Sequence, residues 1–285
     1  MNFRNYQGAE DLDLQEKFWI EVTRALPWCW KRTTSPNLYA NSAQFDPRSR
    51  RFAFEGDRLV GYMSFTGQAE FVSLGYPWVL PGYEGELQQQ LWDAVYGFAA
   101  SQEYGGRTFA QRFRRPWTAQ IDFFKQHGFA ELRVDPLYAL DLRGQMSAQT
   151  SGPYRVEIQL EFHWEEFEPL AAIRSPAEQL EMFKLYFQTV DFDFATRATR
   201  HETPVAYLGF AIRSDTGFAE LIAAGLDPRA EDAITSCLLA AVGTLRSRNA
   251  LLLATKPIPG ESATETLIAM GFRKVSEEVL LSKSI

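Results

Sequence analysis

Val60-Gly61-Tyr62-Met63-Ser64-Phe65 and Val205-Ala206-Tyr207-Leu208-Gly209-Phe210 are two versions of one apolar stretch, and this pair decides the fold. Three more pairs match in the same order along the chain: Phe3-Arg4 with Tyr154-Arg155, Pro81–Val95 with Pro228–Val242, and His127-Gly128-Phe129 with Met270-Gly271-Phe272. Four matches in one order indicate that the chain contains an internal duplication. The alternative is a pair of unrelated domains with similar amphipathic helices.

Length and composition agree with two globular domains. The chain has 285 residues, of which 46% are hydrophobic and 14% aromatic, so apolar side chains are plentiful for two cores. The stretch from Gly144 to Pro153 is polar and rich in small residues, as linkers usually are. We therefore expect domains at residues 1–144 and 153–285.

Each copy shows one order of expected elements, read from hydrophobic spacing and turn residues. In the first copy we expect strands at Phe3–Tyr6, Arg51–Phe54, Leu59–Thr66, Glu70–Leu80 and Thr108–Phe113, and an extended segment at Glu131–Asp141. We expect helices at Leu12–Arg24 and after Pro81, and a short helix that ends at Gly128. In the second copy we expect strands at Tyr154–Leu160, Val205–Arg213, Gly217–Leu226 and Leu251–Thr255, and an extended segment at Lys274–Leu281. We expect helices at Ala177–Thr189 and after Pro228, and a short helix that ends at Gly271.

Charge and cysteine content exclude several classes of protein. The net charge is −7 and the pI about 5.2, and the short group Arg112, Arg114 and Arg115 is too small for a nucleic-acid footprint. Two distant cysteines favour a reducing compartment. The N-terminus has no apolar signal core, and no apolar run reaches the ~20 residues of a membrane helix. We expect a cytoplasmic protein with neither a nucleic-acid nor a membrane partner.

This element order, with two landmarks in each copy, resembles the acyl-CoA-dependent N-acetyltransferases of the GNAT (Gcn5-related) superfamily. The landmarks are an apolar-x-Pro sequence before a helix, at Val79-Leu80-Pro81 and Leu226-Asp227-Pro228, and a Gly-Phe pair after a short helix. The resemblance implies an α/β (α+β) fold of two tandem GNAT-like domains, each a mixed, mostly antiparallel sheet flanked by helices. It also implies acetyl-CoA as cosubstrate and a small-molecule amine as acceptor.

In that superfamily the pantetheine arm lies between the strand before the proline and its parallel neighbour, and the pyrophosphate lies at the start of the next helix. Unpaired N–H groups and the positive end of the helix dipole favour an anion there. The resemblance therefore implies the following acyl-CoA contacts: Val79, Leu80, Gly82 and Gly85 in the first copy, and Leu226, Arg229, Ala230, Asp232, Ala233 and Ile234 in the second.

Both loops depart from the glycine-rich pattern of the superfamily. Glu84 and Glu86 stand in the first loop, and Glu231 and Asp232 in the second. A carboxylate close to a phosphate costs ~1 kcal/mol even when solvated, and Arg229 is the nearby cation that could compensate. The same acidic residues could instead only stabilise the helix N-terminus.

The resemblance implies Glu220 as the catalytic base, because a glutamate at this strand position deprotonates the amine in the histone-acetylating branch. The first copy has Ser73 there. A strand period of two predicts that Glu220 shares a face with Ile222, Ala224 and Leu226 if no bulge intervenes. The alternative is that Glu220 only caps a solvated strand end. Main-chain N–H groups of Pro77–Leu80 or Ala223–Leu226 would polarise the thioester.

The tyrosine that acts as general acid in the superfamily is replaced by Phe124 and Leu267. We expect Cys237 to be a core thiol, the acidic run Glu165–Glu168 to be a solvated helix face, and no metal site, since the histidines lack ligand spacing. Two functions remain open: an N-acetyltransferase with the second copy catalytic, and a non-catalytic duplicated scaffold that binds a ligand or partner.

Overall fold

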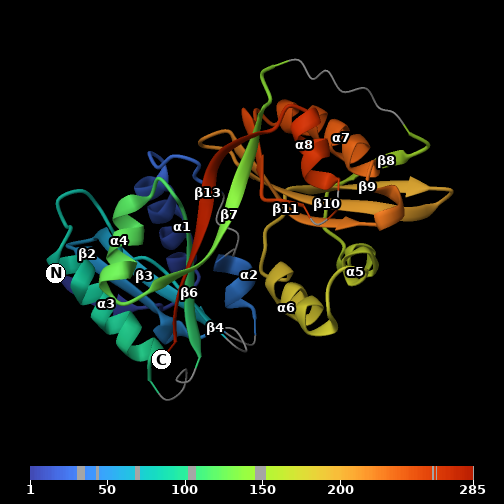
Figure 1. The fold of residues 1–285 in the computed structure, drawn as a ribbon. Coiled ribbons are helices and arrows are strands. Elements are labelled where there is room, and N and C mark those ends of the chain that lie inside the picture. The colour runs from blue at the N-terminus through green and yellow to red at the C-terminus, as the bar shows by residue number, and fades with distance from the viewer. Residues whose placement is uncertain are drawn as a thin grey trace. The chain divides into compact units, whose positions relative to one another are not determined.

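The structure is a computed structural model that describes residues 1–30, 36–42, 45–67, 71–101, 107–144, 152–258, 260 and 262–284. Two compact units make up the chain (Figure 1). The first contains Met1–Pro27, Pro36–Val134 and Glu278–Ile285, and the second contains Trp28–Ser35 and Asp135–Glu277. Residues 145–151 of the expected linker lie outside the described residues.

The first unit is a sheet with strand order β1-β2-β3-β4-β6-β13. Its strands are β1 (Asn2–Asn5), β2 (Arg50–Glu55), β3 (Arg58–Gly67), β4 (Phe71–Leu74), β6 (Thr108–Arg114) and the end of β13 (Arg273–Ser284), with β5 (Trp78–Val79) paired to β3. Its helices are α1 (Glu10–Thr23), α2 (Pro36–Ala40), the short 3₁₀ turn η1 (Pro47–Ser49), α3 (Glu86–Ala99) and α4 (Thr118–Gln126). Among the described residues of this sheet, β4 and β6 pair in parallel, whereas β1 with β2, β2 with β3, β3 with β4, and β6 with β13 pair antiparallel.

The second unit repeats this arrangement with the order β7-β12-β11-β10-β9-β8. Its strands are β7 (Ala130–Asp141), β8 (Arg155–Gln159), β9 (Phe194–Arg200), β10 (Thr203–Arg213), β11 (Phe218–Leu226) and β12 (Leu252–Thr255), and its helices are α5 (Trp164–Ala172), α6 (Ala177–Phe187), η2 (Pro228–Ala230), α7 (Ala233–Ser247) and α8 (Ala263–Ala269). Helices α7 and α8 cover one face of the sheet, and α5 and α6 lie on the other (Figure 1).

The predicted fold class is confirmed, because both units are mixed, mostly antiparallel sheets flanked by helices. Gly128 and Gly271 end their helices with φ of +84° and +99°, a conformation that glycine adopts without strain. The predicted strand Glu70–Leu80 was wrong as one element. It breaks between β4 and β5 where the Gly75 N–H donates to the Ser64 carbonyl at 2.7 Å. The start of that strand, Glu70, lies outside the described residues, and β9 was not predicted.

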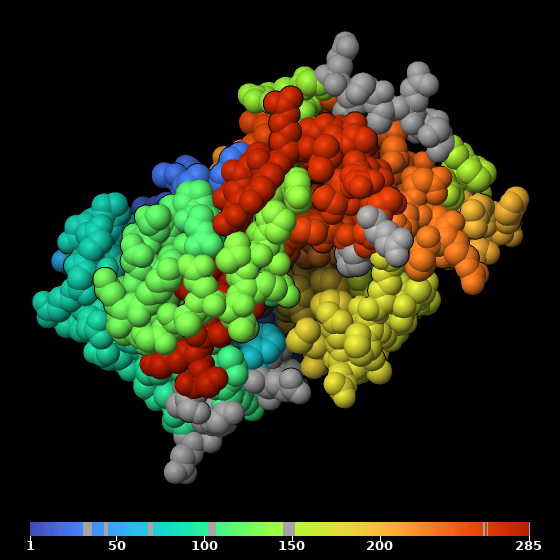
Figure 2. Space-filling view, in the orientation of Figure 1, coloured from blue at the N-terminus to red at the C-terminus, as the bar shows by residue number. Residues whose placement is uncertain are grey.

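The strands that close the two sheets are exchanged between the copies. Glu278–Ser284 of β13 pairs antiparallel with Thr108–Arg114 of β6 in the first unit. Tyr138–Asp141 of β7 pairs antiparallel with Leu252–Thr255 of β12 in the second unit. Red atoms from the chain end accordingly lie among the green atoms of the first unit (Figure 2). The compact units therefore differ at these ends from the predicted division into 1–144 and 153–285.

A buried ion pair secures the exchanged strand in the first unit. The Glu278 carboxylate accepts hydrogen bonds from Arg112 at 3.2 Å and from Arg114 at 3.0 Å. The Arg114 side chain is fully buried and that of Glu278 is 6% exposed. Two charges removed from water are stable only when they neutralise each other. Val279 and Leu281 next to Glu278 are fully buried, so the strand end is also an apolar part of the first unit.

We expect Glu278→Gln to lower the free energy of unfolding by about 3 kcal/mol, because it removes the buried carboxylate that neutralises Arg114. Urea unfolding measures the loss. Glu131→Gln is the matched control: Glu131 also bridges two cations, Arg115 and Lys125, but at the surface, where such pairs are worth about 0–1 kcal/mol. Equal losses for the two variants would show that the buried pair does not secure β13.

Candidate functional site

A bulge in β11 places the candidate base, Glu220, and Leu226 on opposite faces of the strand. In the pairing of β10 with β11, Gly209 lies opposite Ala223 and Phe210 lies opposite Leu221, so Ile222 is an extra residue. One extra residue reverses the alternation of side chains beyond it. Leu226 accordingly lies in the core cluster beneath α7 and α8, together with Ala219 and Leu221. The predicted common face of Glu220 and Leu226 was wrong because this bulge separates them.

Strand β11 leaves its parallel neighbour at the same place. Its first four residues, Phe218–Leu221, pair with Leu252–Thr255 of β12, whereas Ala223–Leu226, after the bulge, pair only with β10 in the register. The first unit shows the same divergence, since β4 pairs with β6 at Phe71–Ser73 and β5 pairs with β3 instead. Both units therefore contain the wedge between parallel strands that the sequence resemblance predicts.

Glu220 is buried, with 7% of its surface exposed. It lies in the last part of β11 that pairs with β12, next to the point where the two strands diverge. Strand alternation puts it on the face of Phe218 and of Ala254, its register partner on β12. That face carries an apolar cluster of Leu137, Ala139, Phe218 and Ala254, against which Trp28 and Trp30 pack. The alternative that Glu220 caps a solvated strand end does not fit this burial.

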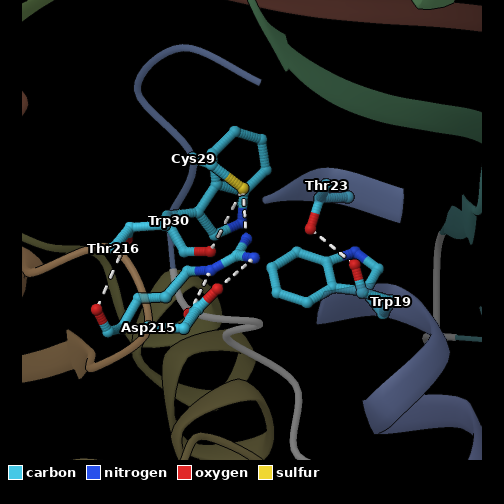
Figure 3. A network of polar contacts seen from close by, with 7 residues as sticks. Trp19, Thr23, Cys29, Trp30, Asp215 and Thr216 are labelled. Carbon is cyan, nitrogen blue, oxygen red and sulfur yellow. Dashed lines mark hydrogen bonds and ion pairs between the residues drawn. The ribbon is translucent and has the colours of Figure 1, made fainter. Parts of the chain in front are cut away.

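The same face carries a buried cation, Arg213, that the sequence did not reveal (Figure 3). Its Nε and Nη2 donate to the Asp215 carboxylate at 2.8 and 3.1 Å, and its Nη1 contacts the Cys29 sulfur. In the register of β10 with β11, Arg213 lies opposite Phe218, two residues from Glu220. The segment Trp28–Trp30, from a region with no recognised function, thus covers part of this face. The run of large apolar residues in this segment was the sequence signal that could have indicated its burial on this face.

The predicted acyl-CoA contacts of the second copy fall into two groups. Leu226, Ala230, Ala233 and Ile234 have buried side chains in the α7 core, so only their backbone could meet a ligand. Arg229 and Asp232 are exposed.

Most of the donors at the start of α7 are engaged within the chain. The Arg229 N–H donates to the Asp227 carboxylate at 2.8 Å, and the Ile234 N–H donates to the Glu231 carbonyl at 3.2 Å. Asp232 accepts the Tyr154 hydroxyl at 2.6 Å. Burial, and then this hydrogen bond, raise the pKa of Tyr154 to about 12.

Glu231 joins three elements of the second unit. One of its carboxylate oxygens contacts Arg174, just after α5. The other accepts from the Ser262 N–H at 3.0 Å and from the Ser262 hydroxyl at 2.8 Å, just before α8. A Cβ at Gly260 would lie 2.9 Å from the Glu231 carboxylate, so a glycine is needed for this approach. The loops after β11 and after β12 are thereby tied together.

In the first copy, side chains satisfy the loop that would meet a phosphate. Gly82 has φ of +92° and its N–H donates to the Glu84 carboxylate at 2.7 Å. Gly85 has φ of +83° and its N–H donates to the Gln88 side chain at 3.2 Å. That amide in turn donates to the Tyr76 hydroxyl at 2.7 Å. Leu80 is buried and Val79 is half-buried.

Aromatic side chains fill the region between β5, β6 and α4. Tyr76 contacts Trp78, Phe113 and Phe123 with ring centroids 4.8, 6.4 and 5.4 Å apart. Trp117 is 2% exposed and donates its indole N–H to the Pro27 carbonyl at 2.7 Å. The first copy therefore holds an aromatic core where the second has small residues, such as Ala223 and Gly225.

Solved structures resemble this chain along its whole length. The tandem GNAT protein from the clavulanic acid biosynthesis pathway gives a TM-score of 0.67 over 99% of this chain and 98% of that one, at 16% identity. A GCN5-related N-acetyltransferase from Sphaerobacter thermophilus gives 0.56, covering 99% and 95%, at 14%. A glucosamine N-acetyltransferase region of a fungal multi-domain β-N-acetylglucosaminidase gives 0.61 over 99% of this chain and 38% of that one, also at 14%.

The chain has the tandem GNAT fold. This confirms the resemblance drawn from the sequence landmarks. No protein-family model and no curated protein matches the sequence.

The remaining sequence candidates have structural places in this GNAT fold. Phe124 and Leu267, which replace the acid tyrosine, are fully buried core residues. Cys237 is a core thiol whose pKa burial raises to about 12. The acidic run on α5 is partly a core element, since Phe167 is buried. Among the described residues, no group of His, Cys, Asp and Glu could hold a metal, and no helix could span a membrane.

Close packing of α5 on β11 holds the face that carries Glu220. A Cβ at Gly225 would lie 2.9 Å from the Cβ of Leu170 on α5. We expect Gly225→Ala to cost about 1–3 kcal/mol of unfolding free energy, because neither backbone can yield freely. The control is Gly243→Ala on α7, where nothing lies within 4 Å and helix propensity should add about 0.5–1 kcal/mol. If urea unfolding showed that both substitutions lower the free energy of unfolding, or that both raise it, this packing would be contradicted.

Proposed function

We propose that the chain is an acyl-CoA-dependent N-acetyltransferase that transfers an acetyl group from acetyl-CoA to a small-molecule amine, with the second copy catalytic. The observation that carries the proposal is the position of Glu220, buried on β11 immediately before that strand leaves β12. The tandem GNAT fold supports acyl transfer only as an analogy, since one fold serves many functions. The local chemistry of the second unit therefore has to carry the assignment.

Each group of the second unit has one task in this proposal. The Glu220 carboxylate accepts a proton from the acceptor ammonium, so that the free amine attacks the thioester carbonyl. Backbone N–H groups within Ala223–Leu226 stabilise the oxyanion. Acetyl-CoA supplies the activated acyl group. No tyrosine protonates the leaving sulfur, and none is required, because a thiol with a pKa of ~8.5 departs readily as thiolate.

The first copy serves in this proposal as a scaffold. Its aromatic core leaves little space beside β5, and Glu84 and Gln88 already engage the N–H groups of Gly82 and Gly85. The residues present do not fit a pantetheine arm and pyrophosphate, so the contacts predicted at Val79, Leu80, Gly82 and Gly85 are not part of the proposal. The copy still contributes β7 to the second unit.

A second candidate function is a non-catalytic duplicated scaffold that binds a ligand or partner. The observation that favours it is the acidic start of α7, where Glu231 and Asp232 oppose a phosphate. We propose a cytoplasmic location for either function. The two cysteines, both within the described residues, form no disulfide, which suits a reducing compartment. Neither function includes a nucleic-acid or membrane partner.

We expect Glu220→Gln to lower kcat by about 10²–10⁴-fold, because the amide cannot accept the proton of the acceptor amine. Acetyl-CoA affinity, measured by calorimetry, should be unchanged. Glu178→Gln, an exposed glutamate at the start of α6, is the control. Turnover that stays at the wild-type level in Glu220→Gln would remove Glu220 from the role of base.

Acetyl-CoA should bind with a stoichiometry of one per chain, because in the first copy side chains already engage the N–H groups of Gly82 and Gly85. At 100 times its Kd it should raise the unfolding free energy by about 2.7 kcal/mol. Calorimetric titration and thermal unfolding measure the two quantities. Two sites per chain would contradict the assignment of the first copy as scaffold. The absence of any binding by acetyl-CoA or other acyl-CoAs would favour the non-catalytic function.

A further inference from the structure

Glu231, in the loop between β11 and α7, contacts both Arg174 and Ser262. Its side chain is 11% exposed, although it lies in a surface loop. It contacts the Arg174 guanidinium and accepts two hydrogen bonds from Ser262. Arg174 keeps 26% of its side chain exposed, so part of this side chain reaches solvent. An anion from solvent could therefore reach this cation without unfolding of the loop.

The carboxylate stands in the loop between β11 and α7, where the proposed function requires the phosphates of acyl-CoA. Two anions at the same place repel each other, and both need the same cation. The other charged side chains of this loop are Asp227, Arg229 and Asp232. Asp227 is engaged by the Arg229 N–H, and Asp232 by the Tyr154 hydroxyl. Arg174 is therefore the cation whose pairing would have to change when a phosphate enters.

We propose that Glu231 occupies the phosphate position in the free protein and that Arg174 exchanges this carboxylate for a phosphate of acyl-CoA. On this reading Arg174 is a cosubstrate-binding residue, and Glu231 sets the affinity by competition. The inference rests on the proposed acyl-CoA-dependent function of the second copy.

Calorimetric titration of the full chain with acetyl-CoA and with S-acetylpantetheine, which lacks phosphates, tests the exchange. Removal of a competing charge at about 4 Å is worth about one order of magnitude in affinity. Glu231→Gln should thus bind acetyl-CoA about tenfold more tightly, and Arg174→Met about tenfold more weakly. Neither change should alter the affinity for S-acetylpantetheine.

The control variant is Glu157→Gln on β8. Glu157 pairs with Arg155 at 2.9 Å and with Arg197 at 3.6 Å, so the variant makes the same charge change away from the wedge. It should bind acetyl-CoA as the wild type does. Thermal unfolding of each variant verifies that it is folded, and Arg174→Met provides an independent readout if Glu231→Gln does not fold.

The outcomes separate the inference from the function on which it rests. Wild-type binding of acetyl-CoA with no gain in Glu231→Gln overturns the exchange and leaves the acetyltransferase proposal intact. An equal gain for S-acetylpantetheine also overturns it, because Glu231 would then act only by obstruction. No binding of acetyl-CoA by the wild type or by either variant contradicts the proposed function itself.

Discussion

The exchange of closing strands is the constraint on which the rest of the structure depends. The first unit closes with Glu278–Ser284 beside β6, and the buried carboxylate of Glu278 between Arg112 and Arg114 secures that strand. The second unit closes with β7, whose Leu137 and Ala139 form part of the apolar face that carries Glu220. Neither copy contains within its own sequence all the strands of its sheet.

This interdependence explains how two copies of one fold can differ in chemistry. The first copy is needed whether or not it binds a ligand, because it supplies strand β7 to the other unit. The first copy has large side chains around its wedge, among them Tyr76, Trp78 and Trp117. The second has Ala223 and Gly225 in the strand that carries Glu220. In the first unit Tyr76 and Trp78 come from β5 and the residues just before it, whereas in the second the small residues of β11 allow Phe167 and Leu170 of α5 to pack against the strand.

The sequence predicted the features that local patterns determine, and missed those that depend on distant contacts. Repeated landmarks predicted the fold, the helix after each proline and the glycines at the ends of α4 and α8. The resemblance singled out Glu220 as a candidate base, and the apolar pattern predicted the strand that carries it. The bulge at Ile222 and the break at Gly75 depend on the register of neighbouring strands, which one strand's pattern does not encode. The exchange of β7 and β13 likewise leaves the hydrophobic pattern of each strand unchanged.

The acidic start of α7 shows why a count of charges misjudges a binding loop. By sequence, Asp227, Glu231 and Asp232 oppose an anion, with Arg229 as the apparent compensation. In the structure each carboxylate has a partner, and the cation that neutralises Glu231 is Arg174, far away in sequence. What an entering phosphate meets is therefore a neutral ion pair and not a bare carboxylate. On the proposed function, the cost of binding is the difference between two pairings of Arg174 and not the repulsion between a phosphate and a bare carboxylate.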